Sequence, residues 1–178
     1  MKLQKIDRSM ALRFLGVRGE APPNIVVLLE KYEPLLFNTI TPRCVWESAP
    51  ILSAVLQGED IQNHVAGCNE ILLLAATVGL PADELIRQTE TFDMAGAVVL
   101  DALASAAVEQ VCDMAEAAIK EKHGKITARF SPGYGDFPLE AQRELLTFLN
   151  VKKKIGLYAN ESNLLIPRKS ITAVIGVF

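Results

Sequence analysis

The chain has only three cysteines and two histidines in 178 residues. Cys44, Cys68 and Cys112 are widely spaced and form no Cys-x-x-Cys pair, so we expect reduced thiols that are mostly buried. His64 and Cys68 are four residues apart and could face each other on a helix, but a zinc site needs two further ligands. A buried cysteine beside an ordinary helix-end histidine explains the pair better, so we expect no metal site.

Long basic runs and long apolar runs are also missing. No basic run exceeds Lys152–Lys154 and the formal net charge is −3, which argues against nucleic acid as a partner. The longest apolar stretches, Ile71–Ala76 and Ala95–Leu100, are too short to span a bilayer. The N-terminus lacks the hydrophobic region of a signal peptide, so we expect a cytoplasmic protein without a membrane partner.

Familiar catalytic motifs are absent as well. Neither Gly-x-x-x-x-Gly-Lys-Ser/Thr nor Gly-x-Gly-x-x-Gly occurs, so phosphate sites of these types are not indicated. No nucleophile elbow and no Ser/His/Asp or Cys/His set suggests itself. We therefore expect no self-contained hydrolytic catalysis and assign no catalytic residue.

What remains is a globular composition, with half of the residues apolar and 22% charged. Spacing and capping residues predict helices at 6–15, 23–37, 61–65, 81–91, 93–122 and 138–150. Strands are predicted at 125–130, 154–157 and 171–178 and a strand or extended segment at 43–47, whereas the aliphatic run at 70–76 fits either strand or helix. This mixture without a strict βαβ rhythm favours a single α+β domain with an antiparallel sheet.

The most informative stretch is 129–142, Arg-Phe-Ser-Pro-Gly-Tyr-Gly-Asp-Phe-Pro-Leu-Glu-Ala-Gln. Ser131 begins a turn in which Gly133 lets the backbone approach a ligand closely, because glycine has no Cβ. Arg129 can hold a carboxylate with two hydrogen bonds, and Tyr134 offers a ring face and a hydroxyl group. An ordinary strand–turn–helix connection with a surface arginine fits the same spacing.

A second candidate lies on the alanine-rich helix predicted at 93–122. Asp101 and Ser105 are four residues apart, so they share one helix face, and an acid among small side chains can lie deep in a groove. Asp101 could equally lie on the solvated face. If Asp101 faces Arg129, the two charges would suit a zwitterion, with the carboxylate at Arg129 and the ammonium at Asp101.

These residues resemble a known family. Arg129–Tyr134 resembles the Arg-x-x-x-Gly-Tyr motif of the S-adenosylmethionine-binding activation (reactivation) domain of cobalamin-dependent methionine synthase. Asp101–Glu109 resembles the family's Glu/Asp-Ala-Leu-Ala helix, and Leu165–Gly176 resembles its Pro-x-x-Ser-Val-x-Gly segment. The resemblance covers about residues 93–178 of one domain, 1–178. The helical part, residues 1–92, looks more like the small stand-alone members.

The resemblance implies a C-shaped α+β domain around a twisted antiparallel sheet with flanking helices. It also implies S-adenosylmethionine in a shallow groove. Arg129 would bind the methionine carboxylate, and backbone near Ser131 and Gly133 would meet the adenosyl part. Tyr134 would pack on the ligand or hydrogen-bond it, and Asp101 would take the ammonium or neighbouring polar groups.

The family's role, again by resemblance, is the repair of cobalamin that has oxidised to the Co(II) form. The domain presents the sulfonium methyl group, and one-electron reduction, here by a flavodoxin-type reductant, allows methyl transfer to cobalt. This chain has no Asp-x-His-x-x-Gly, so cobalamin would come on a separate methyltransferase subunit. Gly135 stands where the large enzymes have proline, and the chain is much shorter than their activation domain.

Two other functions remain open from the sequence. One is an interaction module of the same fold that docks on a corrinoid protein without binding S-adenosylmethionine. The other is an unrelated small-molecule enzyme that uses Arg129, Tyr134 and Asp136 as polar site groups.

Overall fold

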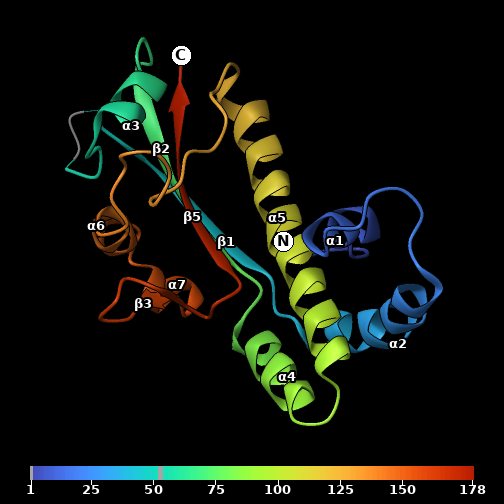
Figure 1. Ribbon diagram of the computed structural model, residues 1–178. Coiled ribbons are helices and arrows are strands. Elements are labelled where there is room, and N and C mark those ends of the chain that lie inside the picture. Colours follow the sequence, from blue (N-terminus) through green and yellow to red (C-terminus); the bar gives the residue numbers. More distant parts are fainter. Residues whose placement is uncertain (1, 52–53) are drawn as a thin grey trace.

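A three-stranded antiparallel sheet forms the centre of the protein in the computed structural model, which describes residues 2–51 and 54–178 (Figure 1). The strands are β1 (Arg43–Ala49), β2 (Glu70–Thr77) and β5 (Ser170–Val177), in the order β1–β2–β5. β2 is the middle strand and is buried along almost its whole length, which explains its continuous aliphatic sequence. The run at 70–76, left open between strand and helix, is therefore a strand.

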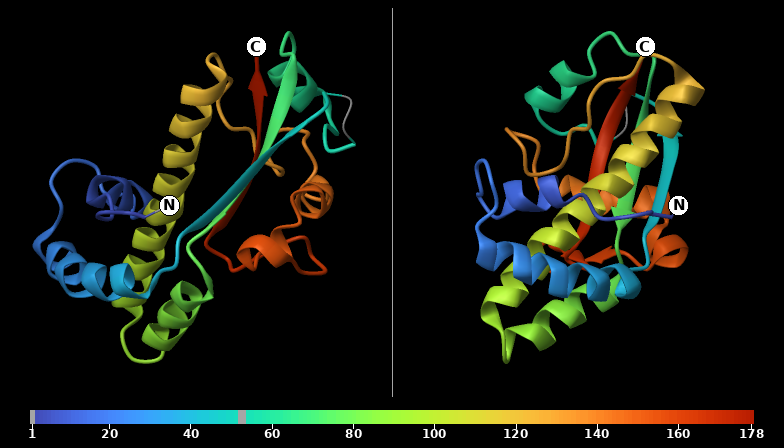
Figure 2. Two further views of the ribbon diagram at one scale, coloured as in Figure 1. Left: turned by 180° about the vertical axis from the view of Figure 1, so that it is seen from behind. Right: turned by 90° about the vertical axis from the view of Figure 1, so that its right-hand side faces the viewer.

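Helices cover both faces of this sheet (Figures 1 and 2). On one face lies the long helix α5 (Met94–His123). Three further helices pack against it: α1 (Arg8–Phe14), α2 (Pro23–Thr39) and α4 (Leu80–Glu90). On the other face lie α3 (Glu59–His64), α6 (Ala141–Leu149), α7 (Val151–Ile155) and a small hairpin of β3 (Tyr158–Ala159) and β4 (Leu165–Ile166).

Alternation along the strands divides the core between these two layers. Leu72 and Leu74 on β2 point to the α5 face, whereas Leu73 and Ala75 point to the α6 face. Residues before position 93 supply β1 and β2 and so are not only helical. The assignment of residues 1–178 to one domain remains a prediction.

Helix α5 is long and apolar enough to cross a membrane by length and composition, but 67% of its most apolar window is buried inside the protein. Its buried alanines let it lie close to the sheet and to α2 and α4. Burial against the sheet therefore accounts for its composition. Cys112 on this helix and Cys44 on β1 are free thiols, and burial raises the pKa of each to about 12.

Two predicted strands are wrong. Residues 125–130 run along the outer edge of β5 but pair with it only at two isolated bridges, Ile126 with Val177 and Phe130 with Val174. Between these bridges the N–H of Gly176 donates to the hydroxyl oxygen of Thr127 (2.9 Å), so a side chain replaces the backbone acceptor and a regular ladder does not form.

The second error falls at 154–157. Helix α6 ends at Leu149, its C-cap residue Asn150 adopts the left-handed conformation (φ 50°, ψ 42°), and α7 begins directly afterwards at Val151. The three lysines at 152–154 consequently lie in this short helix. The extended segment begins later, at Tyr158.

Helix α2 meets α5 at a glycine. Tyr32 is 2% exposed, and its hydroxyl donates to Asp93 Oδ2 (2.6 Å), the N-cap residue of α5. The other carboxylate oxygen accepts from the N–H of Gly96 (2.9 Å), and Lys31 Nζ lies 3.2 Å from Oδ2. A Cβ at position 96 would lie 2.2 Å from Tyr32 Cε2, so the two helices can approach this closely only because residue 96 is glycine.

We expect Gly96→Ala to destabilise the protein. In an unobstructed helix this change adds about 1 kcal/mol of stability, but here the new methyl group must displace the Tyr32 ring, and we expect a net loss of about 1–3 kcal/mol. Urea denaturation measures the change, and the same substitution in a Tyr32→Ala background should recover the helix gain. A more stable single variant would contradict the close contact.

Low pH should weaken the contact between α2 and α5, because it protonates Asp93. The hydrogen bond from Tyr32, followed by those from Gly96 and Lys31, lowers the pKa of Asp93 from 3.8 to about 2. A carboxyl group whose pKa is lower in the folded state than in the unfolded state stabilises the fold at pH values above its unfolded-state pKa. This stabilisation is lost as the pH falls through the folded-state pKa. The stability difference between the wild type and Asp93→Asn should therefore shrink between pH 3.8 and about 2. A difference that is constant with pH in denaturation curves would refute this.

Candidate functional site

The turn that follows residues 125–130 is held by its own backbone. The N–H of Gly133 donates to the carbonyl oxygen of Phe137 (2.8 Å), and the N–H of Tyr134 donates to that of Ser131 (3.2 Å). Gly133 (φ +94°) and Gly135 (φ +55°) are in the left-handed region that favours glycine. Phe137 anchors the turn in the core at 1% exposure, whereas Tyr134 at its tip is 67% exposed and available for contact.

Arg129 points from this segment toward α5. Its Nη2 lies 2.8 Å from Asp113 Oδ1 and 3.1 Å from Glu109 Oε2, and its Nε lies 3.4 Å from Glu116 Oε2. The three acids are four and three residues apart, so they project from one face of the helix. Although burial lowers it, neighbouring negative groups raise the pKa of Arg129 above its usual value overall, so the side chain is charged.

The charge balance around Arg129 is unequal. One guanidinium faces three carboxylates, so the cluster carries a net formal charge of −2 and repels further anions while attracting cations. Arg129 Nη1 is buried and has no hydrogen-bond partner among the residues described. A buried, unsatisfied donor costs about 1–3 kcal/mol. Nη1 is therefore the nitrogen of the guanidinium left without a partner among the described residues, and because it is buried, an external acceptor can reach it only after neighbouring side chains move.

Asp101 does not face Arg129. It pairs with Lys169 Nζ at 2.8 Å, and the same ammonium group donates to Ser105 Oγ (2.9 Å). Glu109, the nearest acid partner of Arg129 along α5, is two helical turns away, or about 12 Å. The zwitterion arrangement with Arg129 and Asp101 as immediate neighbours is therefore not formed. The side chain of Asp101 is 45% exposed, so it is neither deep in a groove nor fully solvated.

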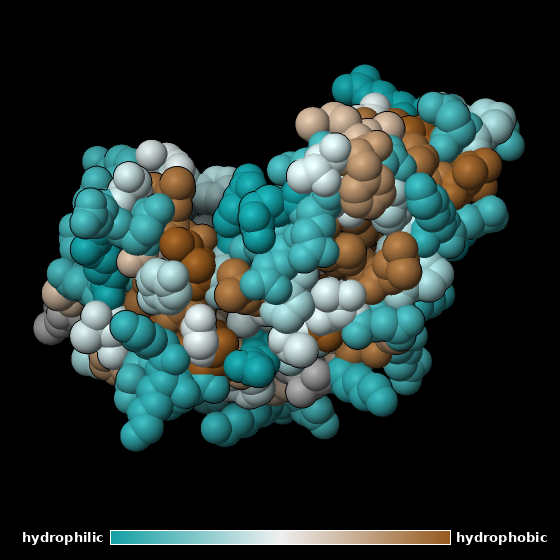
Figure 3. Space-filling view, turned by 90° about the horizontal axis from the view of Figure 1, so that it is seen from below, coloured by the Kyte–Doolittle hydropathy of each residue, from teal (hydrophilic) through white to brown (hydrophobic). Residues whose placement is uncertain are grey.

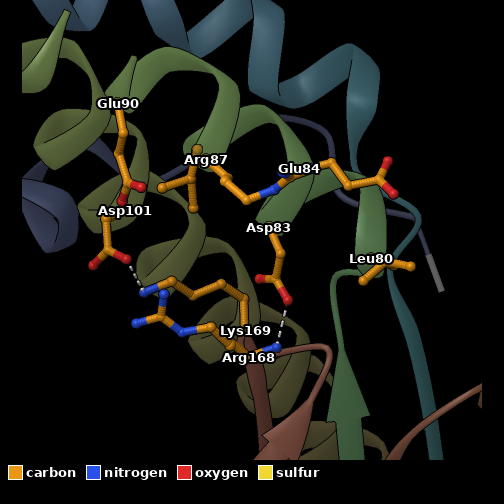
Figure 4. Close-up of a pocket in the computed structure, with 9 residues that line it drawn as sticks. Leu80, Asp83, Glu84, Arg87, Glu90, Asp101, Arg168 and Lys169 are labelled. Carbon is orange, nitrogen blue, oxygen red and sulfur yellow. Dashed lines mark hydrogen bonds and ion pairs between the residues drawn. The ribbon is translucent and has the colours of Figure 1, made fainter.

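Asp101 instead lines a cleft of about 350 Å³ between α4, α5 and the turn before β5 (Figure 4). Asp83 Oδ2 accepts from the N–H of Arg168 (2.6 Å), and its Oδ1 is buried without a partner among the described residues. Met94 and Val98, one to two turns before Asp101 on α5, are exposed, and hydrophobic groups reach the surface on this lower side (Figure 3). The charges in the cleft are mixed, so no one class of ion is favoured.

Asp101 and Arg129 are nevertheless connected to one strip of α5, Asp101 as a member of it and Arg129 through its ion pairs. Lys169 lies at one end of the strip and Arg129 at the other, and each cation is held by acids from the helix. The strip consists of Asp101, Ser105, Glu109, Asp113 and Glu116. No role was predicted for Glu109, Asp113, Glu116 or Lys169 from the sequence. Their helical spacing was visible, but the face of α5 that meets Arg129 is set by packing.

No protein-family model matches the chain, and no curated protein matches it in sequence. Several solved structures match its fold. One of them is the crystal structure of the MetH reactivation domain bound to AdoHcy. The match spans 97% of this chain and 74% of that chain, with a TM-score of 0.70 and 16% sequence identity. The chain has the fold of the MetH reactivation domain. This confirms the α+β class that the sequence predicted and the fold that the resemblance implied.

Within the reactivation-domain fold, the ion cluster makes Arg129 important for stability. Arg129→Met would leave three carboxylates without a counter-charge, and we expect the free energy of unfolding to fall by roughly 1–3 kcal/mol, less than for a fully buried pair because the acids are partly exposed. Arg129→Lys keeps the charge and should lose less. High salt should reduce the difference in free energy of unfolding between Arg129→Met and Arg129→Lys, because salt screens the charges. If denaturation shows that Arg129→Met loses the same free energy of unfolding at low and at high salt, charge is not the cause of the loss.

Proposed function

We propose that this protein is an S-adenosylmethionine-binding activation domain that supports reductive methylation of cob(II)alamin on a separate corrinoid protein. The observation that carries the proposal is the fold match over 97% of the chain to a reactivation domain bound to AdoHcy. The Arg-x-x-x-Gly-Tyr sequence at Arg129–Tyr134 adds to it, because the turn holds Gly133 and Tyr134 in a defined conformation.

The residues around Arg129 suit both the negative group and the positive groups of such a ligand. In this proposal the side chains around Arg129 shift on binding, so that its buried Nη1 is exposed and donates to the methionine carboxylate, while Glu109 and Asp113 attract the ammonium and the sulfonium. Backbone at Ser131 and Gly133 faces the adenosyl part, and the exposed Tyr134 ring packs on it. Asp101 lies farther along α5, so in this proposal it contacts the ligand only where the ligand extends along the helix.

The wider role follows from the same resemblance. The sulfonium methyl group is what the ligand supplies, and the nucleophile is cobalt on a cobalamin-binding methyltransferase subunit. This chain therefore needs binding and orientation groups alone, which is the type of group that Arg129 and Tyr134 provide. A flavodoxin-type reductant as electron donor and a cytoplasmic location complete the proposal.

A second candidate is the interaction module without S-adenosylmethionine. It is favoured by the engagement of Arg129, because a ligand carboxylate must approach a cluster with a net charge of −2. The small-molecule enzyme is less well supported. Both carboxylate oxygens of Asp136 accept backbone N–H groups from the start of α3, so this acid is not free to act on a substrate.

Isothermal titration with S-adenosylmethionine and AdoHcy tests the proposal. The wild type should bind S-adenosylmethionine saturably, and Arg129→Lys should bind it about 10- to 100-fold more weakly, since it keeps the charge but loses the donors of Nη1, about 1.5–3 kcal/mol. Tyr134→Ala should also weaken binding and, because the ring is exposed, leave stability unchanged.

Arg8→Lys is the matched control, because Arg8 forms an ion pair with Glu33 away from the turn. It should bind like the wild type. If the wild type gives no heat with either ligand, the interaction module replaces the proposal. If Arg129→Lys binds normally, Arg129 is not the carboxylate clamp.

A further inference from the structure

Two segments that are 76 residues apart in sequence bind each other reciprocally. Asp136 Oδ2 accepts from the N–H of Glu59 (2.6 Å), and Asp136 Oδ1 accepts from the N–H of Asp60 (2.9 Å). In return, Asp60 Oδ2 accepts from the N–H of Asp136 (3.0 Å). Each aspartate thus satisfies backbone donors of the other segment. We call this pair of contacts the aspartate clamp.

Glycines make the clamp sterically possible. A Cβ at Gly58 (φ +111°) would lie 2.5 Å from Asp136 Oδ1 and 2.7 Å from the Asp136 carbonyl oxygen. A Cβ at Gly135 (φ +55°) would lie 2.0 Å from Asp60 Oδ2. Both positions also need the left-handed backbone that glycine adopts readily. Each glycine therefore leaves room for the aspartate of the opposite segment.

The aspartate clamp supplies hydrogen-bond acceptors for the first N–H groups of α3. The first N–H groups of a helix have no partner within it, and Gly58 at the N-cap has no side chain to supply one. Asp136 provides both acceptors and places a negative charge at the positive end of the helix. A six-residue helix is thereby fixed from outside, and its fully buried Ile61 anchors it in the core.

Helix α3 also holds the segment before the turn. His64 Nε2 lies 2.8 Å from the carbonyl oxygen of Ala128, and the His64 ring lies 4.9 Å from the Phe130 ring, centroid to centroid. The contacts at Ala128 and Phe130 come at the start of residues 129–134, and the clamp at Asp136 comes after their end. The segment with the candidate binding groups is held on both sides by one helix.

We infer that Asp60 and Asp136 are positioning residues for ligand binding at residues 129–134. This rests on the proposed function, since it concerns the same ligand. The two acids touch no ligand themselves. They fix the backbone of the turn before binding, so the ligand does not have to order it. Loss of the clamp should weaken binding while α5, the sheet and the ion pairs of Arg129 remain intact.

The experiment compares four variants by titration with S-adenosylmethionine and by hydrogen exchange of residues 59–60 and 131–137. Asp136→Ala and Asp60→Ala should bind on the order of 10-fold more weakly, because the ligand must then order the turn itself, and both segments should exchange faster. Asp60→Asn should recover most of the affinity, because its amide oxygen can still accept the N–H of Asp136.

Asp7→Ala is the matched control. Asp7 caps α1 in the same way, accepting from the N–H groups of Ser9 (2.8 Å) and Met10 (3.1 Å), but α1 packs on α5 away from the turn. It should lose comparable stability and keep its affinity. Equal loss of affinity in Asp7→Ala would mean that general destabilisation is the cause and would overturn the inference.

The two proposals fail in different ways. A wild type that binds the ligand, together with an Asp136→Ala variant that binds equally well, overturns the positioning role and leaves the proposed function standing. A wild type that binds neither S-adenosylmethionine nor AdoHcy overturns the proposed function, and the positioning role falls with it.

Discussion

The packing of α5 across one face of the sheet is the constraint on which the rest of the molecule depends. Its apolar side closes the core over β2 and β5, and its first turn, at Gly96, receives α2. Its polar side presents Glu109 and Asp113 to Arg129. Because both sides belong to one rigid helix, the depth and rotation that suit the core also determine where the acids stand. The geometry of the candidate site is therefore a consequence of core packing.

This arrangement gives the site a definite electrostatic character. Three acids held by one arginine favour a ligand that carries positive charge, and the low exposure of the Arg129 side chain, 19%, limits screening by solvent. Under the proposed function, the cluster would distinguish S-adenosylmethionine from AdoHcy by charge, because only the former has a sulfonium cation. A carboxylate alone would meet repulsion at the same place. If the ligand carboxylate reaches Arg129 Nη1, it does so because the ligand brings a cation for the acids as well.

The sequence allowed the prediction of features that depend on local pattern. The long helix, the last strand and the glycine turn were predicted close to their positions, because apolar spacing and turn residues act over a few residues. The helix at Val151 was missed, because Asn150 reverses the chain in a left-handed conformation that the sequence does not require. The partner of Asp101 was missed because Lys169 is brought to it by the fold, 68 positions along the chain. The cluster around Arg129 fails to show in the sequence for the same reason.

The surface position of the turn bears on what kind of protein this is. An enzyme that completes its own reaction encloses the reacting groups and excludes water. Here Tyr134 is largely exposed, and Gly133 adds no side chain to cover a bound molecule. A ligand on this turn would keep one side open to a second protein, as a methyl donor must if its acceptor is carried elsewhere. Few side chains surround such an open site, so other contacts must hold its backbone in place. Helix α3 makes these contacts with Ala128 and Asp136. Under the proposed function, the exposed turn would present the ligand to the partner, and the contacts with α3 would keep the turn in place while it does so.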